Sequence, residues 1–163
     1  MKTLSDMDWK SWQPTERATL LFVIKEGQVL LIHKKRGLGA GKINGPGGRI
    51  EPGETPMQCA IREVEEELCI TAKGVRECGE MSFQFMDGYS LHCTVFTASD
   101  YSGTPQETDE AIPLWFALDK LPYQDMWQDD QYWMPLMIEG KKFRGFFLFD
   151  DDIMLDKRIE IAD

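Results

Sequence analysis

The sequence predicts a mixed α/β fold with two principal helices, and three observations support that class. Segments rich in β-branched and aliphatic residues are separated by turn residues, as strands are. One long segment repeats apolar residues at helical spacing behind a clear start signal. The 163 residues, 42% of them hydrophobic, suffice for one domain with a real core. We therefore expect a single domain over residues 1–163, with residues 1–14 as an N-terminal extension.

The first strands are expected near the N-terminus. Residues 19–24 and 28–35 are aliphatic and flank a short Lys-Glu-Gly turn, which predicts a hairpin. A glycine-rich segment follows over residues 36–54, and its Gly and Pro content excludes regular structure across most of that span. A loop of this length in a compact domain usually has a functional role.

The next segment carries the signals of a helix start. Thr55 precedes Pro56 in the first helical position, and Gln58 completes a capping-box pattern with Thr55. The apolar residues that follow fall at helical spacing, so they are expected to face a sheet. These residues are Met57, Ala60, Ile61, Val64 and Leu68.

The rest of the chain alternates strands with a second helix. Residues 81–86, 90–98 and 113–118 have the alternation of strands, and residues 127–140 are expected to form the second helix. Residues 142–150 and 153–161 predict a closing hairpin.

The charge balance limits the classes of function. Lys and Arg number 18 against 28 Asp and Glu, which gives a net charge of −10 and a pI near 4.7. Binding of long nucleic acid needs clustered Lys and Arg, so that class is disfavoured. No apolar run suits a signal peptide or a membrane span. We expect a cytoplasmic monomer with a small-molecule substrate and no membrane partner.

The cysteines and histidines predict neither disulfides nor zinc. No CxxC pair is present, and the two histidines are isolated. We expect all four cysteines to be reduced and structural: Cys59, Cys69, Cys78 and Cys93.

The predicted first helix carries a cluster of like charges. Glu63, Glu66 and Glu67 stand at i, i+3 and i+4 and therefore project from one side. Their repulsion is relieved by a hard divalent cation, Mg²⁺ or Mn²⁺, with oxygen ligands. Arg62, one turn before Glu66, is placed to orient that carboxylate. A solvated acidic face is the alternative for a glutamate run taken alone.

The segment GRIEPGETPMQCAIREVEEELCI, which starts at Gly48, resembles the Nudix box G-x5-E-x7-R-E-U-x-E-E-x-G-U, where U is a bulky aliphatic residue. Cys69 departs from the pattern because it replaces a glycine. By the resemblance, that glycine stands at the C-terminal end of the helix with a positive φ. A side chain in that conformation costs roughly 1 kcal/mol. The matching positions are Gly48, Glu54, Arg62, Glu63, Val64, Glu66, Glu67 and Ile70.

The resemblance implies a fold and a reaction. The fold is a Nudix-like α/β/α sandwich with a mixed central sheet. The reaction is metal-dependent hydrolysis of a nucleoside diphosphate linked to another group, with Mg²⁺ as the expected cofactor and Mn²⁺ as a substitute. Either Glu63 or Glu110 is the general base, and Arg62 is the expected partner of Glu54. The implied metal ligands are the Gly47 carbonyl, Glu63, Glu66, Glu67 and Glu110.

From about residue 19 to residue 159, the chain resembles the Nudix branch that hydrolyses oxidised purine nucleoside triphosphates. By this resemblance Asn44, Trp127, Asp129 and Asp130 recognise the base. Two adjacent carboxyl groups desolvated against a base share a proton, because like charges raise one pKa. The alternative role for either aspartate is to cap the second helix.

Other positions match substrate contacts of that branch. Leu38 stands where the branch has a phenylalanine, and Leu91 where it has a methionine, so the pocket shape differs there. Phe83 and Trp127 are expected to line the pocket, although either could be ordinary core. The remaining expected contacts are Thr19, Lys34, Pro46, Gly47, Gly48 and Arg49.

The resemblance therefore implies hydrolysis of substrates such as 8-oxo-dGTP and 2-hydroxy-dATP to monophosphate and pyrophosphate, which sanitises the nucleotide pool. The alternative within the family is another nucleotide: an ordinary dNTP, a nucleoside diphosphate sugar or an RNA 5′ end. A binding domain without catalysis is a different class. Damage to the carboxylate set would indicate it, and none of these carboxylates is missing.

Overall fold

The computed structural model describes residues 3–162. Its elements follow one another along the chain as η1 (Leu4–Asp6), β1 (Glu16–Lys25), β2 (Gln28–Lys34), β3 (Ile43–Asn44), β4 (Gly47–Arg49), α1 (Pro56–Leu68), β5 (Thr71–Lys73), β6 (Arg76–Phe85), β7 (Ser90–Ala98), β8 (Asp100–Ser102), β9 (Ala111–Ala117), η2 (Tyr123–Asp125), α2 (Asp130–Ile138), β10 (Lys142–Asp150) and β11 (Ile153–Ala162). The ends of the predicted domain, residues 1–2 and 163, lie outside the described residues.

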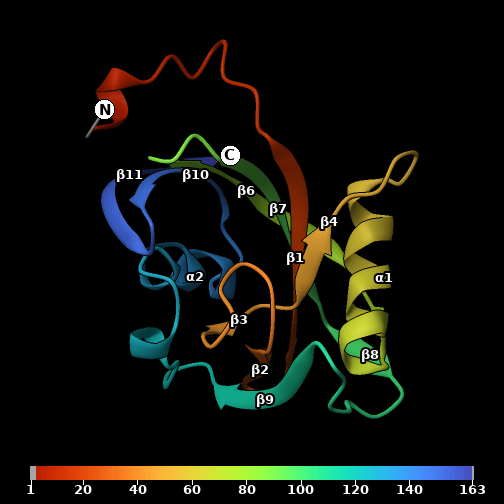
Figure 1. The fold of residues 1–163 in the computed structure, drawn as a ribbon. Coiled ribbons are helices and arrows are strands. Elements are labelled where there is room, and N and C mark those ends of the chain that lie inside the picture. Colours follow the sequence, from red (N-terminus) through yellow and green to blue (C-terminus); the bar gives the residue numbers. More distant parts are fainter. Residues whose placement is uncertain (1–2, 163) are drawn as a thin grey trace.

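A mixed sheet forms the centre of the fold (Figure 1). Its strand order is β11-β10-β6-β7-β1-β2-β3, with β4 on β1 and β9 on β2. Strand β1 runs parallel to β7, and β10 runs parallel to β6, whereas the other pairs are antiparallel. Strands β5 and β8 form a separate antiparallel pair.

The predicted first hairpin exists only at its turn. Strands β1 and β2 pair at Ile24 and Lys25, next to a turn in which Glu26 and Gly27 have positive φ. Beyond that point β1 pairs with β7 and β4, and β2 pairs with β9 and β3. The two strands therefore diverge because each finds its hydrogen bonds with partners distant in the sequence.

Helix α1 begins and ends as the sequence predicts. Thr55 Oγ1 accepts a hydrogen bond from Gln58 N at 3.1 Å, and Thr55 N donates to Gln58 Oε1 at 2.9 Å, which completes the capping box. Cys69 follows the helix with φ of 64°, in the left-handed region. The glycine position of the box thus has the conformation that favours glycine.

The two faces of the sheet hold two apolar cores, and the helices cover them. Ala60, Val64 and Leu68 of α1 pack in one core, and Trp133, Met134 and Met137 of α2 pack in the other. This arrangement is the predicted α/β/α sandwich. The expectation for Met57 is wrong, since its side chain is 42% exposed in the first turn of α1.

Several boundaries differ from the predicted ones. Helix α2 begins at Asp130 instead of residue 127, because residues 127–130 form a turn in which Asp130 N donates to Trp127 O. Strand β6 begins at Arg76, five residues before the predicted start, and the short strands β5 and β8 are not predicted. The glycine-rich segment is irregular apart from β3 and β4. No helix in residues 3–162 is long and apolar enough to cross a membrane.

Candidate active site

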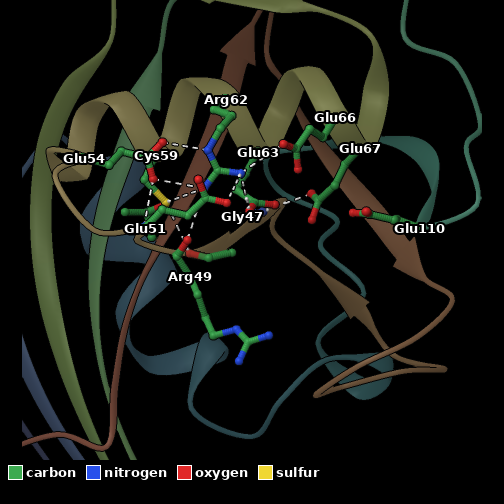
Figure 2. Close-up of polar contacts among 12 residues, drawn as sticks. Gly47, Arg49, Glu51, Glu54, Cys59, Arg62, Glu63, Glu66, Glu67 and Glu110 are labelled. Atoms are coloured by element: carbon green, nitrogen blue, oxygen red, sulfur yellow. Dashed lines mark hydrogen bonds and ion pairs between the residues drawn. The ribbon is translucent and has the colours of Figure 1, made fainter.

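Three carboxylates meet beside the glycine-rich segment. Helix α1 contributes Glu63 and Glu67, and the chain just before β9 contributes Glu110. One oxygen from each lies within 4.8 Å of the others, and Figure 2 shows the Glu67 and Glu110 side chains approaching each other. We call these three residues the acid cluster. Within residues 3–162, no other group of acidic, histidine or cysteine side chains gathers in this way.

The surroundings of the acid cluster disfavour its negative charge. Glu67 is only 4% exposed, and burial, followed by the charge of Glu63, raises its pKa to about 8. Burial also raises the pKa of Glu63 above its ordinary value. Gly47 N donates to Glu67 Oε2 at 3.1 Å and partly offsets this effect. The side chains of the acid cluster supply oxygen ligands for a hard divalent cation, and a cation bound between them would offset the cost of ionising them.

The glycine-rich segment approaches the acid cluster through its main chain. A Cβ atom on Gly47 would collide with the carbonyl of Thr19, and one on Gly48 would overlap the carboxylate of Glu63. Glycine is therefore required at residue 47, where the obstacle is main chain, whereas a side chain at residue 48 would displace the Glu63 carboxylate. The oxygen ligands of the acid cluster are a donor set that fits a cation. Lys34 lies near the acid cluster: burial lowers the pKa of Lys34, while the charges of Glu67, Glu63 and Glu110 act in the opposite direction.

Arg62 connects the acid cluster to the start of α1 (Figure 2). Its Nε donates to Glu54 Oε2 at 2.6 Å, so the predicted pair exists, and the guanidinium lowers the pKa of Glu54 to about 2. Its Nη1 donates to Glu63 at 2.9 Å and to Glu66 at 3.0 Å. Glu66 lies outside the acid cluster, with its side chain 49% exposed and bound to Arg62.

A cavity of about 820 Å³ extends from the acid cluster into the core between the sheet and α2. It brings together every predicted substrate contact except Pro46, whose carbonyl is hydrogen-bonded to Leu21 N. The predicted residues on its wall are Thr19, Lys34, Leu38, Asn44, Gly47, Gly48, Arg49, Phe83, Leu91, Trp127, Asp129 and Asp130.

The wall also contains residues that the sequence did not single out. Phe22, Phe85 and Trp133 are among them, together with the polar residues Glu16 and Tyr89. The sequence does indicate Phe85, because side chains alternate along a strand and Phe85 therefore lies on the same face of β6 as Phe83. Nothing local in the sequence indicates that α2 turns Trp133 toward the same space.

Asp129 and Asp130 line the same cavity at the start of α2, which covers the opposite face of the sheet from α1. We call them the aspartate pair, and we call the parts of the cavity beside the acid cluster and beside this pair its two ends. Asp129 and Asp130 are 2% and 8% exposed. Asp129 Oδ2 accepts a hydrogen bond from Trp133 Nε1 at 2.8 Å, and its side chain makes no capping bond to α2. Burial raises the pKa of Asp129 to about 6, and burial together with the charge of Asp129 raises that of Asp130 well above its ordinary value. Burial and the neighbouring charge thus favour a proton on Asp130 more strongly than on Asp129.

Trp127 fixes the orientation of the Asn44 amide. Indole nitrogen is a donor only, so the atom of Asn44 that lies 3.1 Å from Trp127 Nε1 is Oδ1. Asn44 Nδ2 donates to Lys42 O at 3.0 Å and to Gly39 O at 3.3 Å. Gly39 has φ of +84°, and a Cβ there would lie 2.7 Å from Trp127 Nε1. An amide oxygen has two lone pairs, and Trp127 Nε1 occupies one of those on Asn44 Oδ1, so the other remains as an acceptor.

The mouth of the cavity has charged and apolar residues. Arg49 Nη1 donates to Glu16 Oε2 at 2.6 Å, and Tyr89 Oη donates to Glu16 Oε1 at 2.7 Å. Arg36 lies 3.3 Å from Glu110 Oε1. Leu38, on the glycine-rich segment, has 46% of its surface exposed.

The chain matches the model of the NUDIX domain over residues 14–137, well over half its length. The chain therefore belongs to the NUDIX family of hydrolases, enzymes that use a divalent metal, and the acid cluster lies within the matched region.

Two relatives and one solved structure are similar over most of the chain. The oxidized purine nucleoside triphosphate hydrolase of Danio rerio is 42% identical over 144 residues, which cover 87% of this chain and 92% of that protein. Its counterpart of the same description in Mus musculus is 43% identical, covering 82% of this chain and 86% of that protein. The MutT protein structure from Bacillus halodurans has a TM-score of 0.81 at 26% identity, covering 89% of this chain and 97% of that one.

Proposed function

We propose that the protein hydrolyses oxidised purine (deoxy)nucleoside triphosphates, with Mg²⁺, to the monophosphate and pyrophosphate. The observation that carries the proposal is one cavity with the acid cluster at one end and the aspartate pair at the other. Such a cavity suits a ligand with a polyphosphate at one end and a hydrogen-bonding base at the other. The descriptions of the two animal relatives support the same substrate class.

At the phosphate end, Glu63, Glu67 and Glu110 would hold Mg²⁺ together with the Gly47 carbonyl. Glu66 would join them by exchanging its contact with Arg62 for the metal. Mg²⁺ bound there neutralises phosphate oxygens and lowers the pKa of water. Lys34 faces the same end and would bind a phosphate oxygen, since Lys acts as a point charge toward phosphate.

A carboxylate must also accept the proton of the attacking water, and two residues are candidates. Glu63 is supported by its raised pKa and its contact with Arg62. Glu110 is supported by its place at the opposite side of the acid cluster, beside Arg36. The rate of Glu63→Gln and of Glu110→Gln against pH decides between them, because removal of the base abolishes the acidic limb of the profile.

At the base end, the aspartate pair offers a donor and an acceptor side by side. A protonated Asp130 would donate to a purine acceptor, and Asp129 would accept from a ring or amino N–H. The remaining lone pair of Asn44 Oδ1 would accept from a further N–H. Trp127, Phe83, Leu38 and Leu91 would enclose the ring, and Thr19, Pro46, Gly48 and Arg49 would complete the substrate contacts.

Initial rates with Mg²⁺ test the proposal directly. The panel is 8-oxo-dGTP, 2-hydroxy-dATP, dGTP, a nucleoside diphosphate sugar and a 5′-triphosphorylated RNA, compared by kcat/KM. We expect a clear preference for the oxidised dNTPs. Equal kcat/KM values across the panel, or a preference for the nucleoside diphosphate sugar or the RNA, would contradict the proposed substrate class. The family assignment would stand.

The proposal includes a monomeric, single-domain enzyme of the cytoplasm. All four cysteines are free in the described residues, as a reducing compartment favours. Light scattering during gel filtration tests the monomer, and fractionation of the native source tests the location. A dimer mass or a membrane-bound fraction would contradict this part of the proposal.

A further inference from the structure

The segment before β1 packs against the sheet at two places, and we call residues 3–15 the strap. Figure 1 shows it crossing above β11 and β10 before it enters β1. Leu4 is buried, and its N donates to Asp156 Oδ2 at 2.8 Å. The ring of Trp9 lies 5.1 Å from that of Phe146. The match to the family model begins only at residue 14, so nearly all of the strap precedes it.

The second attachment of the strap runs through one side-chain amide. Trp12 Nε1 donates to Gln84 Oε1 at 2.9 Å. The Nε2 of the same amide donates to the carbonyl oxygens of Phe85 at 2.9 Å and Tyr89 at 3.2 Å. Gln84 thus links the strap to both ends of the turn between β6 and β7.

The cavity lies on the other side of that turn. Phe85 and Tyr89 both line it, and Phe85 packs edge-on against Trp127 at 6.2 Å. Trp127 is in turn the hydrogen-bond donor to Asn44. A shift of the turn would move Phe85 and Tyr89 and, through the contact of Phe85, also Trp127. Close-packed interiors transmit such displacements, so the base end of the cavity would change shape.

We propose that Trp12, through Gln84, positions the Phe85–Tyr89 turn and thereby sets the affinity of the cavity for the purine base. This inference rests on the proposed function for the identity of the ligand. Trp12 and Gln84 are positioning residues, since neither lines the cavity.

The chemical step should be insensitive to the strap. The hydrogen bonds between residues 3–15 and the sheet involve Gln84, Ser90 and Asp156, and none of these residues belongs to the acid cluster. Loss of one neutral hydrogen bond should therefore raise KM by about three- to tenfold and change kcat by less than about twofold.

The chain offers a matched control for this test. Trp9 and Trp12 pack against each other with ring centroids 5.3 Å apart, but Trp9 Nε1 has no hydrogen-bond partner within the described residues. Trp9→Phe and Trp12→Phe are thus the same change in one aromatic cluster, and only the second removes a bond to Gln84. We expect a raised KM for Trp12→Phe and for Gln84→Met, and an unchanged KM for Trp9→Phe. Equal KM values in the two tryptophan variants, or a parallel fall in kcat, would overturn the proposal.

Amide hydrogen exchange without nucleotide provides a test that does not need activity. Trp12→Phe should speed the exchange of residues 85–90 relative to both wild type and Trp9→Phe. Equal exchange in the three proteins would reject the positioning role. If wild type hydrolyses no nucleotide of the panel but this exchange difference is present, the proposed function fails and the link between strap and turn stands.

Discussion

The two ends of the cavity hold their carboxylates in different ways. The acid cluster consists of two side chains from α1 and one from the residue that precedes β9. Arg62 and Lys34 lie beside them. The aspartate pair is more deeply buried as a whole, and Asp129 accepts a hydrogen bond from the Trp133 indole. A bound cation would stabilise the ionised form of the first arrangement, whereas in the second burial and the neighbouring carboxyl group favour a proton on Asp130.

The comparison shows that burial alone does not decide what a carboxylate does. Burial is the largest cause of the raised pKa of both Glu67 and Asp129. The neighbours differ, because Glu67 accepts a hydrogen bond from the main chain of Gly47, and Asp129 accepts one from an indole and adjoins a second carboxyl group. The same kind of side chain is thus suited to metal binding at one end and to base recognition at the other.

The largest effect should come from removing one member of the acid cluster. Glu67→Gln should lower kcat/KM by at least about 100-fold, since a neutral amide is a poor ligand for Mg²⁺. It should also abolish the rise in melting temperature that Mg²⁺ gives wild type. The control is Glu65→Gln, an exposed position on the same helix whose carboxylate binds Thr71. Full activity in Glu67→Gln would refute the assignment of this end.

The aspartate pair should show the next largest effect. Asp129→Asn should lower kcat/KM for the oxidised purine triphosphates by about 10- to 100-fold, because it removes the anionic acceptor of a buried hydrogen-bond set. The variant should retain the stabilisation by Mg²⁺, which Glu67→Gln loses. Asp119→Asn, at an exposed position, is the control. Unchanged turnover of every nucleotide would eliminate Asp129 as a reader of the base.

Both ends should lower the free energy of unfolding as pH rises, over different ranges: about 3.8 to 6 for Asp129 and about 4.5 to 8 for Glu67. Asp129 binds its proton more tightly in the folded protein, with a pKa of about 6 against 3.8. The folded state therefore holds more protons between these values, and the free energy of unfolding falls as pH rises through them, by about 3 kcal/mol at most. Urea unfolding of the metal-free protein between pH 4 and 8 should show this decline, and Asp129→Asn should reduce it. A decline of the same size in both proteins would contradict the raised pKa of Asp129.

The smallest effect should come from the end of α1, outside both regions. Cys69→Gly should raise the free energy of unfolding by about 0.5–1 kcal/mol, because glycine adopts φ of 64° without the cost of a side chain. Its kcat/KM should match that of wild type, because Cys69 belongs to neither the acid cluster nor the aspartate pair. Thermal unfolding with steady-state kinetics measures both, and a loss of stability would show that the thiol makes a compensating contact.

Local sequence signals predicted helix α1 correctly. Most errors in the predicted fold arose from pairing between strands that are distant in the sequence. The capping box of Thr55 and Gln58 acts within one turn, so the sequence shows it directly. The β1–β2 hairpin looked complete because its residues are adjacent, yet β1 pairs over most of its length with β7, 75 residues later in the register. Strands β5 and β8 are only three residues long each and pair across a long separation, so no periodicity could indicate them.

The candidate site divides in the same way. The spacing of Glu63 and Glu67 on one helix follows from helical geometry, but the arrival of Glu110 beside them depends on the path of the chain into β9. Resemblance to the family supplied that residue, and physical reasoning about spacing did not. The hydrogen bond of Trp12 to Gln84 had no sequence signal, since it joins an aromatic residue and an amide 72 positions apart.

The tryptophans of the cavity also have an optical consequence. Trp127 and Trp133 both line it at the base end, and each indole N–H is bound to a side chain proposed to read the base, Asn44 or Asp129. The residues of the acid cluster absorb no near-ultraviolet light. Occupation of the base end should therefore change the fluorescence of these two tryptophans, two of the five in the chain, so the protein contains its own reporter for that half of the ligand.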